Sequence, residues 1–226
     1  MLRLAWTCAL LFCGAAQAQF AASAGVDSEY RFRGVSLSDG RPGLRLSLSY
    51  DHPGGAYAGT SATEAELARG QRYTQLLGYA GFVTRTEQGC SWEFGLSASH
   101  FGGDSSYDYA EVFAGLLTER WSLRVYYAPD YFGRGQATAY AELDGHLALA
   151  PPWRLFGHAG ALAVVGGVVD RDTRTTRTDL RAGLGLTVAS FDVQLAWVGA
   201  SRGGPYPADY GGMRRTGWVL SASASF

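Results

Sequence analysis

Residues 91–100 read SWEFGLSASH, and their side chains alternate between apolar and polar at every second position. One face carries Trp92, Phe94, Leu96 and Ala98, and the other carries Glu93, Gly95, Ser97 and Ser99. Because successive side chains of a β-strand point to opposite faces, this alternation predicts a strand with one apolar and one polar face. Ordinary strands have about five or six residues, whereas about ten suit a tilted span of a membrane.

The same alternation recurs along the rest of the chain. We interpret as clear strands the residues 20–33, 43–50, 120–127, 137–147, 178–188 and 217–226. Weaker strands are expected near 55–62, 71–83, 108–118, 153–163 and 191–200. The total is about twelve strands, an even number, as bacterial outer-membrane barrels have.

Short and long connections alternate between these strands. Short turns are expected at 51–55, 87–89, 118–120, 150–152 and 189–190. Longer loops are expected near 34–42, 62–71, 102–108, 129–136, 164–177 and 201–215. Tight periplasmic turns alternating with long external loops are typical of outer-membrane barrels. The sequence therefore predicts an all-β fold, a closed antiparallel transmembrane β-barrel with short periplasmic turns and longer external loops.

The composition and the N-terminal segment fit export to the outer membrane of a bacterial cell. The chain has 226 residues, of which 47% are hydrophobic and 17% charged, with a formal net charge of -1. This balance argues against disorder and against a nucleic-acid partner. Arg3, the apolar stretch 4–16 and the triplet Ala16-Gln17-Ala18 predict a signal peptide, residues 1–18, that is cleaved. Residues 19–226 then form a single barrel domain, in which Cys90 is the one remaining cysteine and has no disulfide partner.

Aromatic side chains fall near both ends of the predicted strands. Beside the short turns stand Tyr50, Trp92, Trp121, Trp153, Phe191 and Phe226. Nearer the longer loops stand Tyr30, Phe32, Tyr107, Tyr131, Phe132, Trp197 and Trp218. We interpret them as two girdles at the two interfaces with outer-membrane lipid. The terminal Phe226, on the apolar face of the last strand, resembles the aromatic signal that the barrel assembly machinery reads.

The charged residues of the strands are expected inside the barrel, since a charge facing lipid costs about 2–4 kcal/mol at the bilayer midplane. The predicted lumen set is Glu29, Arg31, Arg33, Arg45, Glu93, Glu111, Arg124, Glu142, Asp144, Arg154 and Arg181. This set mixes both signs. It therefore supports either a narrow aqueous pore or a salt-bridged plug that conducts nothing.

Catalytic and metal-binding patterns are weak, and we predict no enzyme, no cofactor and no metal site. His100 with Ser97 or Ser99 is a remote candidate for a barrel enzyme that acts on lipid. Asp170 and Asp172 lie in a charged loop, but the central Gly and terminal Glu of a calcium-binding EF-hand are missing there. A further alternative is a non-conducting barrel whose external loops, above all residues 201–215, form an interaction surface.

Several motifs resemble the TorF family of proteobacterial porins over about residues 22–226. They are YRFRGVSLSDGRPGLRLSLSY (30–50), YAEVFAGL (109–116), LRVYYAPDYFG (123–133) and YAELDGH (140–146). The resemblance implies an outer-membrane β-barrel with a channel role. Among the motif residues, Asp39-Gly40 suits a tight turn and Pro129-Asp130 the exit from a strand into a loop. Gln75 departs from the acidic residue expected there by analogy with Glu111.

These observations predict a passive pore for small polar or charged solutes. Within the lumen set, Arg31, Arg33 and Arg124 would favour anions locally. Glu29, Glu111 and Glu142 would oppose them. Because the chain's net charge is close to zero, the sequence does not indicate which sign of charge the pore favours overall.

Overall fold

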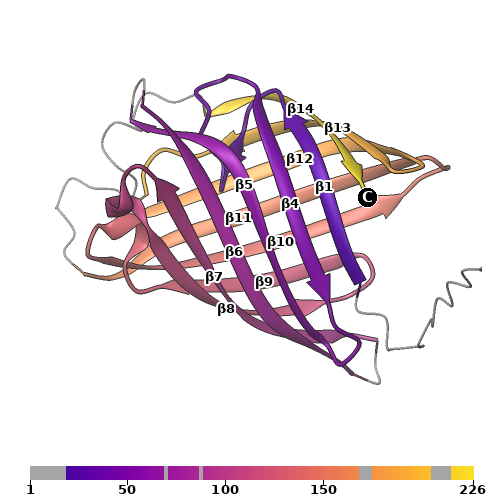
Figure 1. Cartoon of the computed structure of the whole chain (residues 1–226), viewed down its shortest axis with the longest axis horizontal. Helices are drawn as coiled ribbons and strands as arrows, with labels where there is room; N and C mark the ends of the chain where they lie inside the picture. Colours follow the sequence, from indigo (N-terminus) through magenta and orange to yellow (C-terminus); the bar gives the residue numbers. More distant parts are fainter. Residues whose placement is uncertain (1–18, 69–70, 87–88, 168–174, 205–214) are drawn as a thin grey trace, which may run out of the picture.

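The computed structural model describes residues 19–68, 71–86, 89–167, 175–204 and 215–226. Their main feature is a closed barrel of twelve strands (Figure 1). The barrel strands are β1 (Gln19–Asp27), β4 (Gly43–Asp51), β5 (Ala56–Ala68), β6 (Gln71–Arg85), β7 (Ser91–Gly102), β8 (Tyr109–Leu117), β9 (Trp121–Ala128), β10 (Gln136–Ala148), β11 (Trp153–Gly167), β12 (Thr176–Val188), β13 (Phe191–Ala200) and β14 (Thr216–Ser225). The predicted signal peptide, residues 1–18, lies outside the described residues. No helix in the described ranges is long and apolar enough to cross a membrane.

The barrel is closed by pairing of the first and last strands. β1 and β14 are antiparallel neighbours, with partners from Ser23↔Ser225 to Asp27↔Ser221. Every other barrel strand pairs antiparallel with the next one along the ring. A closed ring leaves no strand edge unpaired, which is the condition for a sheet to exist within hydrocarbon. The predicted fold class and strand number are confirmed.

The two faces of the strands differ as the alternation predicts. On β7, Trp92, Phe94 and Leu96 are 47%, 53% and 57% exposed on the outside. Glu93 and Ser99, on the inner face of the same strand, are 5% and 3% exposed. The predicted interface aromatics also face outward. These are Tyr50, which is partly exposed, and the exposed Trp92, Trp121, Trp153, Trp197, Trp218 and Phe226.

Charges on the outer face stay close to one end of the barrel. Glu64 and Arg72 point outward and pair at 3.7 Å near the long-loop ends of β5 and β6. The prediction of a loop at 62–71 is wrong, because β5 continues to Ala68 and β6 begins at Gln71. Beyond the apolar band, side chains of both faces can be polar. The alternation therefore disappears there although the backbone pairing continues.

The N-terminal part of the chain contains the largest departure from prediction. The expected strand 20–33 ends at Asp27, and the following segment folds into the barrel as a short hairpin of β2 (Arg31–Phe32) and β3 (Val35–Ser36). The first part of the expected loop 34–42 is consequently inside the barrel, because Val35, Ser36 and Leu37 are at most 2% exposed, whereas Asp39, Gly40 and Pro42 are exposed. The hairpin turns at Gly34, whose φ of +72° places it in the left-handed region.

A small apolar core lies inside the barrel at its long-loop end. We call it the lumen cluster; its members are Val35, Leu37, Ala65, Phe101, Tyr109, Ala128, Tyr131, Phe132, Tyr140 and Leu162. Tyr131 and Phe132 belong to the short 3-10 helix η2 (Tyr131–Gly133), and a second one, η1 (Ser105–Tyr107), precedes β8. The prediction of a girdle at this end is therefore wrong for five aromatics. They pack inward, into or against the lumen cluster: Tyr30, Phe32, Tyr107, Tyr131 and Phe132.

Candidate functional site: the charged lumen

Two adjoining cavities occupy the interior of the barrel. One has a volume of about 520 Å³ and reaches the turn between β8 and β9 at Thr118 and Arg120. The other has a volume of about 460 Å³ and lies beneath the hairpin, whose Phe32 and Arg33 line it. The cavities share four lining residues, Arg31, Arg33, Arg124 and His158. Each of the eleven residues of the predicted lumen set lines at least one of them.

The hairpin is anchored by a buried ion pair. Arg33 donates from Nη1 and Nη2 to the two carboxylate oxygens of Glu111, at 2.9 and 2.7 Å. Its guanidinium also lies 4.2 Å from the ring centroid of Tyr140 and 5.1 Å from that of Tyr126. Parallel bidentate hydrogen bonds and aromatic faces both favour arginine over lysine at such a position. Because both partners are almost fully enclosed, this pair has little charge left to offer a solute.

Two further ion pairs lie in the lumen. Arg31 donates from Nε to Glu29 at 2.9 Å, and both belong to the inward-folded segment. Glu93 accepts from Arg124 Nε at 2.5 Å and from the Tyr57 hydroxyl at 2.6 Å. The sequence analysis placed these charges in the lumen without their partners. Tyr57 in particular had no assigned face.

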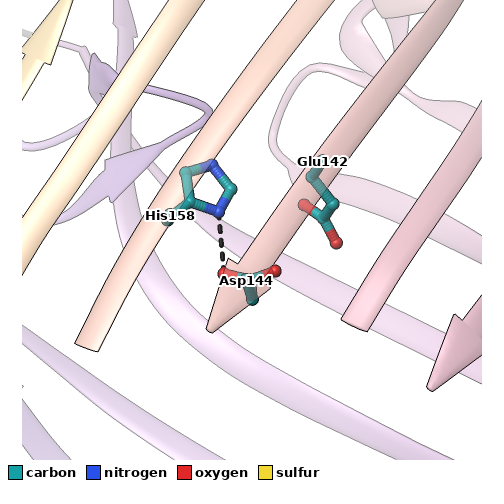
Figure 2. A group of neighbouring side chains, drawn as sticks. All are labelled: Glu142, Asp144 and His158. Carbon is teal, nitrogen blue, oxygen red and sulfur yellow. Dashed lines mark hydrogen bonds and ion pairs between the residues drawn. The ribbon is translucent and has the colours of Figure 1, made fainter. Parts of the chain in front are cut away.

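Near the middle of the wall, His158 lies between two carboxylates. Its Nδ1 is 2.8 Å from Asp144 Oδ1, and its Nε2 is 2.9 Å from Asp179 Oδ1. Glu142, two residues before Asp144 on β10, completes the group that Figure 2 shows. Asp144 and His158 are direct cross-strand partners on β10 and β11. His158 and Asp179 were missing from the predicted site, although their inward alternation on neighbouring strands is visible in the sequence.

At the short-turn end the charges are more accessible. Arg154 donates to Asp192 at 2.9 Å. Nearer the long-loop ends of β1 and β4, Arg45 lies 3.8 Å from Asp27. Arg181 donates to the Gln194 side chain at 2.9 Å instead of to a carboxylate. Asp27 and Asp192 are lumen carboxylates that the predicted set did not include. Together these residues place both signs of charge around the larger cavity.

The remaining motif residues have local roles. Asp39 and Gly40 have φ values of +51° and +74°, as the predicted tight turn requires. Pro129 and Asp130 follow the end of β9, and Asp130 accepts a hydrogen bond from Gly135 N–H at 2.6 Å. Gln75 is buried and accepts from the Tyr30 hydroxyl at 3.1 Å, so an amide takes the position where an acid was expected.

The candidate lipid-hydrolysing pair is contradicted by the structure. His100 points outward and contacts Asp108 at 2.6 Å, whereas Ser97 and Ser99 are buried on the inner face of β7. Neighbouring positions of one strand face opposite sides, so these groups cannot meet. Nearby, the Ser106 hydroxyl and backbone N–H both donate to Asp104, which lowers the pKa of that carboxyl group. Asp170, Asp172 and residues 205–214 of the predicted interaction loop lie outside the described residues.

Solved structures with a similar fold are outer-membrane porins and channels. A KdgM porin aligns with 91% of this chain and 99% of its own length, at a TM-score of 0.58 and 14% sequence identity. A NanC porin aligns with 91% and 99%, at 0.59 and 10% identity. The COG4313 outer membrane channel from Pseudomonas putida F1 aligns with 93% and 95%, at 0.54 and 11% identity. At these identities the likeness establishes a porin-like barrel fold.

The comparison at the level of sequence is more restricted. No curated protein matches the chain. The family described as "Bacterial protein of unknown function (Gcw_chp)" matches residues 13–226, which includes the whole barrel. The resemblance to the TorF family stays a prediction. The chain belongs to the Gcw_chp family of bacterial proteins.

Proposed function

We propose that this protein is a bacterial outer-membrane channel through which small polar or charged solutes diffuse passively. The observation that carries the proposal is the closed barrel with an apolar outer face and two charged interior cavities. An apolar outer face is suited to contact with lipid, and a charged inner wall favours water and polar solutes in the interior. In this proposal the outward aromatics contact outer-membrane lipid, and Phe226 is the signal for the barrel assembly machinery.

The arrangement of charges supports weak rather than strong selectivity. Most of the lumen arginines described above have a carboxylate within 4.0 Å, so the local fields largely cancel. A solute crossing the lumen meets alternating signs, and both anions and cations find partners on the wall. In this proposal a solute passes from one cavity to the other beneath the hairpin, where Arg31, Arg33 and Arg124 line both cavities.

A second candidate is a barrel that does not conduct, and the lumen cluster specifically favours it. Residues from the hairpin, η2 and several strands pack together at the long-loop end, and Leu37, Phe101 and Tyr131 are 0% exposed. Such packing resembles a protein core more than the wall of a water-filled path. In this alternative the external loops interact with partners, and the barrel serves as their support.

Conductance measurements distinguish the two candidates. We expect the purified protein to give discrete conductance steps in planar bilayers. Liposomes that contain it should swell in a small neutral sugar and in galacturonate; one matched structure is titled as a KdgM porin in complex with disordered oligogalacturonate. The matched variant replaces residues 31–36 by a Gly-Ser linker of equal length, which removes the side chains of the hairpin.

Each result decides between the candidates. Steps from the natural protein that grow larger in the linker variant support the channel. If the natural protein gives no conductance steps and the linker variant does, the closed barrel is supported. If neither conducts although both show the heat-modifiable gel migration of a folded barrel, the channel function is wrong.

A further inference from the structure

We propose that Glu142, Asp144 and His158 form a binding site for a divalent transition-metal ion of the Zn²⁺ type in the wall of the lumen. The inference goes beyond the proposed diffusion of solutes, because it concerns a ligand that is held in place. It depends on the arrangement of one histidine and three carboxylates on three neighbouring strands.

The register of the sheet brings the three proposed ligands together. Asp144 on β10 is directly opposite His158 on β11, and Glu142 precedes Asp144 by two residues, so it shares the same inward face. One ligand atom from each of the three lies within 4.8 Å of the others. Figure 2 shows the three side chains as neighbours, with His158 and Asp144 in contact. A single ion could contact all three once their side chains move slightly closer together.

The hydrogen bonds of His158 prepare one nitrogen for a metal. Carboxylates only accept hydrogen bonds, and a neutral imidazole has one donor and one acceptor nitrogen. When Nε2 donates to Asp179 at 2.9 Å, the lone pair of Nδ1 faces Asp144 Oδ1 at 2.8 Å. Two acceptors at that distance repel unless a proton or a cation lies with them. A metal-binding histidine commonly donates its other N–H to a carboxylate, as His158 does to Asp179 in this tautomer.

Asp179 is itself held firmly as the outer partner. It is 4% exposed, and the Tyr140 hydroxyl lies 3.3 Å from its Oδ2. The space for this contact depends on Gly160, where a Cβ would collide with the Tyr140 hydroxyl and the Asp179 carboxylate. The ring orientation of His158 is thus fixed from the side opposite the proposed ion.

The dimensions and donors suit Zn²⁺. Nitrogen and oxygen ligands bind Zn²⁺ at about 2.0–2.2 Å, so two of them lie about 2.9–3.4 Å apart. The 2.8 Å between His158 Nδ1 and Asp144 Oδ1 needs only a small opening to reach that range. Glu142 uses Oε1 to accept from the Tyr126 hydroxyl at 2.9 Å, and its second oxygen is the proposed ligand. Three protein ligands leave a position for water or a solute group.

The surroundings give an ion access to the site and leave most of the negative charge of the site to be balanced by it. Asp144 and Asp179 line the larger cavity, Glu142 lines the smaller one, and His158 lines both, so an ion can arrive through the lumen. Positive groups nearby already have other partners. Arg124 is 3.9 Å from Glu142 but 2.5 Å from Glu93, and Arg181 donates to Gln194.

Titration calorimetry with ZnCl₂ on the purified full chain in detergent micelles tests the site. We expect one Zn²⁺ per chain, and at least about tenfold weaker binding in His158→Gln and in Asp144→Asn, since each variant removes one ligand. The matched control is His100→Gln, which removes an outward-facing histidine and should leave the affinity within a factor of about two. Folding of each variant is checked by heat-modifiable gel migration.

A second measurement remains informative if a variant does not fold. X-ray absorption at the zinc edge of the natural protein should show one imidazole among oxygen ligands. The proposal is overturned if the natural protein binds no Zn²⁺ at millimolar concentration, if His158→Gln binds as tightly as the natural protein, or if the absorption spectrum shows sulfur from Cys90. Binding in micelles needs no conduction, so failure of this site and failure of the channel are told apart.

Discussion

The two ends of the lumen use the same residue types in different ways. At the long-loop end, the side chains of Arg33 and Glu111 are 6% and 4% exposed, beneath the lumen cluster. At the short-turn end, Arg154 and Asp192 form a similar pair whose side chains are 25% and 24% exposed. In a desolvated ion pair, loss of one partner leaves the other charge buried and is strongly destabilising. A hydrated ion pair contributes little to stability, and its charges can still interact with ions in the lumen.

If the barrel conducts, this difference assigns structural support to the long-loop end and conduction to the more hydrated part of the lumen. The inward hairpin is a piece of folded core inside the ring, and its ion pair orients it. The larger cavity near the short turns has a wall of charges that water reaches. We therefore expect substitutions at the long-loop end to change mainly the free energy of unfolding. Substitutions at the short-turn end should change mainly the passage of ions.

Removal of Glu111 should have the largest effect. Glu111→Ala leaves the guanidinium of Arg33 buried without its carboxylate, and we expect the free energy of unfolding to fall by about 3–5 kcal/mol. Urea unfolding of the refolded protein in micelles, followed by tryptophan fluorescence, measures this change.

Asp192→Ala is the control at the other end. It removes the carboxylate partner of Arg154, which stays hydrated, so the loss should be no more than about 1 kcal/mol. Equal losses in Glu111→Ala and Asp192→Ala would show that the two ends do not differ in the way proposed.

Truncation inside the lumen cluster should have the next largest effect. Phe101 is 0% exposed and stacks on Phe132 with ring centroids 5.7 Å apart. We expect Phe101→Ala to lower the free energy of unfolding by about 3 kcal/mol, because it leaves a cavity in a packed core. The matched change is Phe156→Ala, which lines the open cavity. A cost for Phe156→Ala as large as that for Phe101→Ala would contradict a packed core confined to the long-loop end.

The sequence predicts those parts of the fold that have lipid on one side and the polar lumen on the other. Between lipid and lumen every second side chain must be apolar, so Leu96 and Ser97 already indicate their faces. That constraint is absent from the inward segment. Tyr30 and Phe32 continue the alternation of the first strand, although the chain leaves the sheet after Asp27. Their burial comes from packing against the lumen cluster, most of whose members are distant in the sequence, and periodicity does not report such contacts.

For the candidate site as well, the sequence predicts which face a side chain occupies but not which residues it contacts. Alternation places Asp144, Arg154 and Arg181 on the inner face, and the structure finds them there. It does not give the register between strands, and the pairing of Asp144 with His158 is a matter of register. Asp179 also follows the inward alternation, but its contact with His158 is visible only in the three-dimensional structure.

Reversal of a well-exposed lumen charge should have the smallest effect, and it tests how ions respond to hydrated charges. The Arg45 side chain is 42% exposed and only 3.8 Å from Asp27. If the channel conducts, Arg45→Glu should shift the permeability ratio toward cations by about twofold, since it reverses a hydrated charge in the path. The reversal potential across a planar bilayer with a KCl gradient measures this ratio.

The same measurement on a buried charge shows which charges the ions meet. Arg33→Met with Glu111→Leu replaces the enclosed pair by apolar groups, and the net charge of the lumen stays the same. If the ions respond to hydrated charges alone, this double variant should keep the natural reversal potential although Arg45→Glu does not. A shift in the double variant without one in Arg45→Glu would place the selective region beneath the hairpin. The buried pair would then have to be regarded as part of the conducting path.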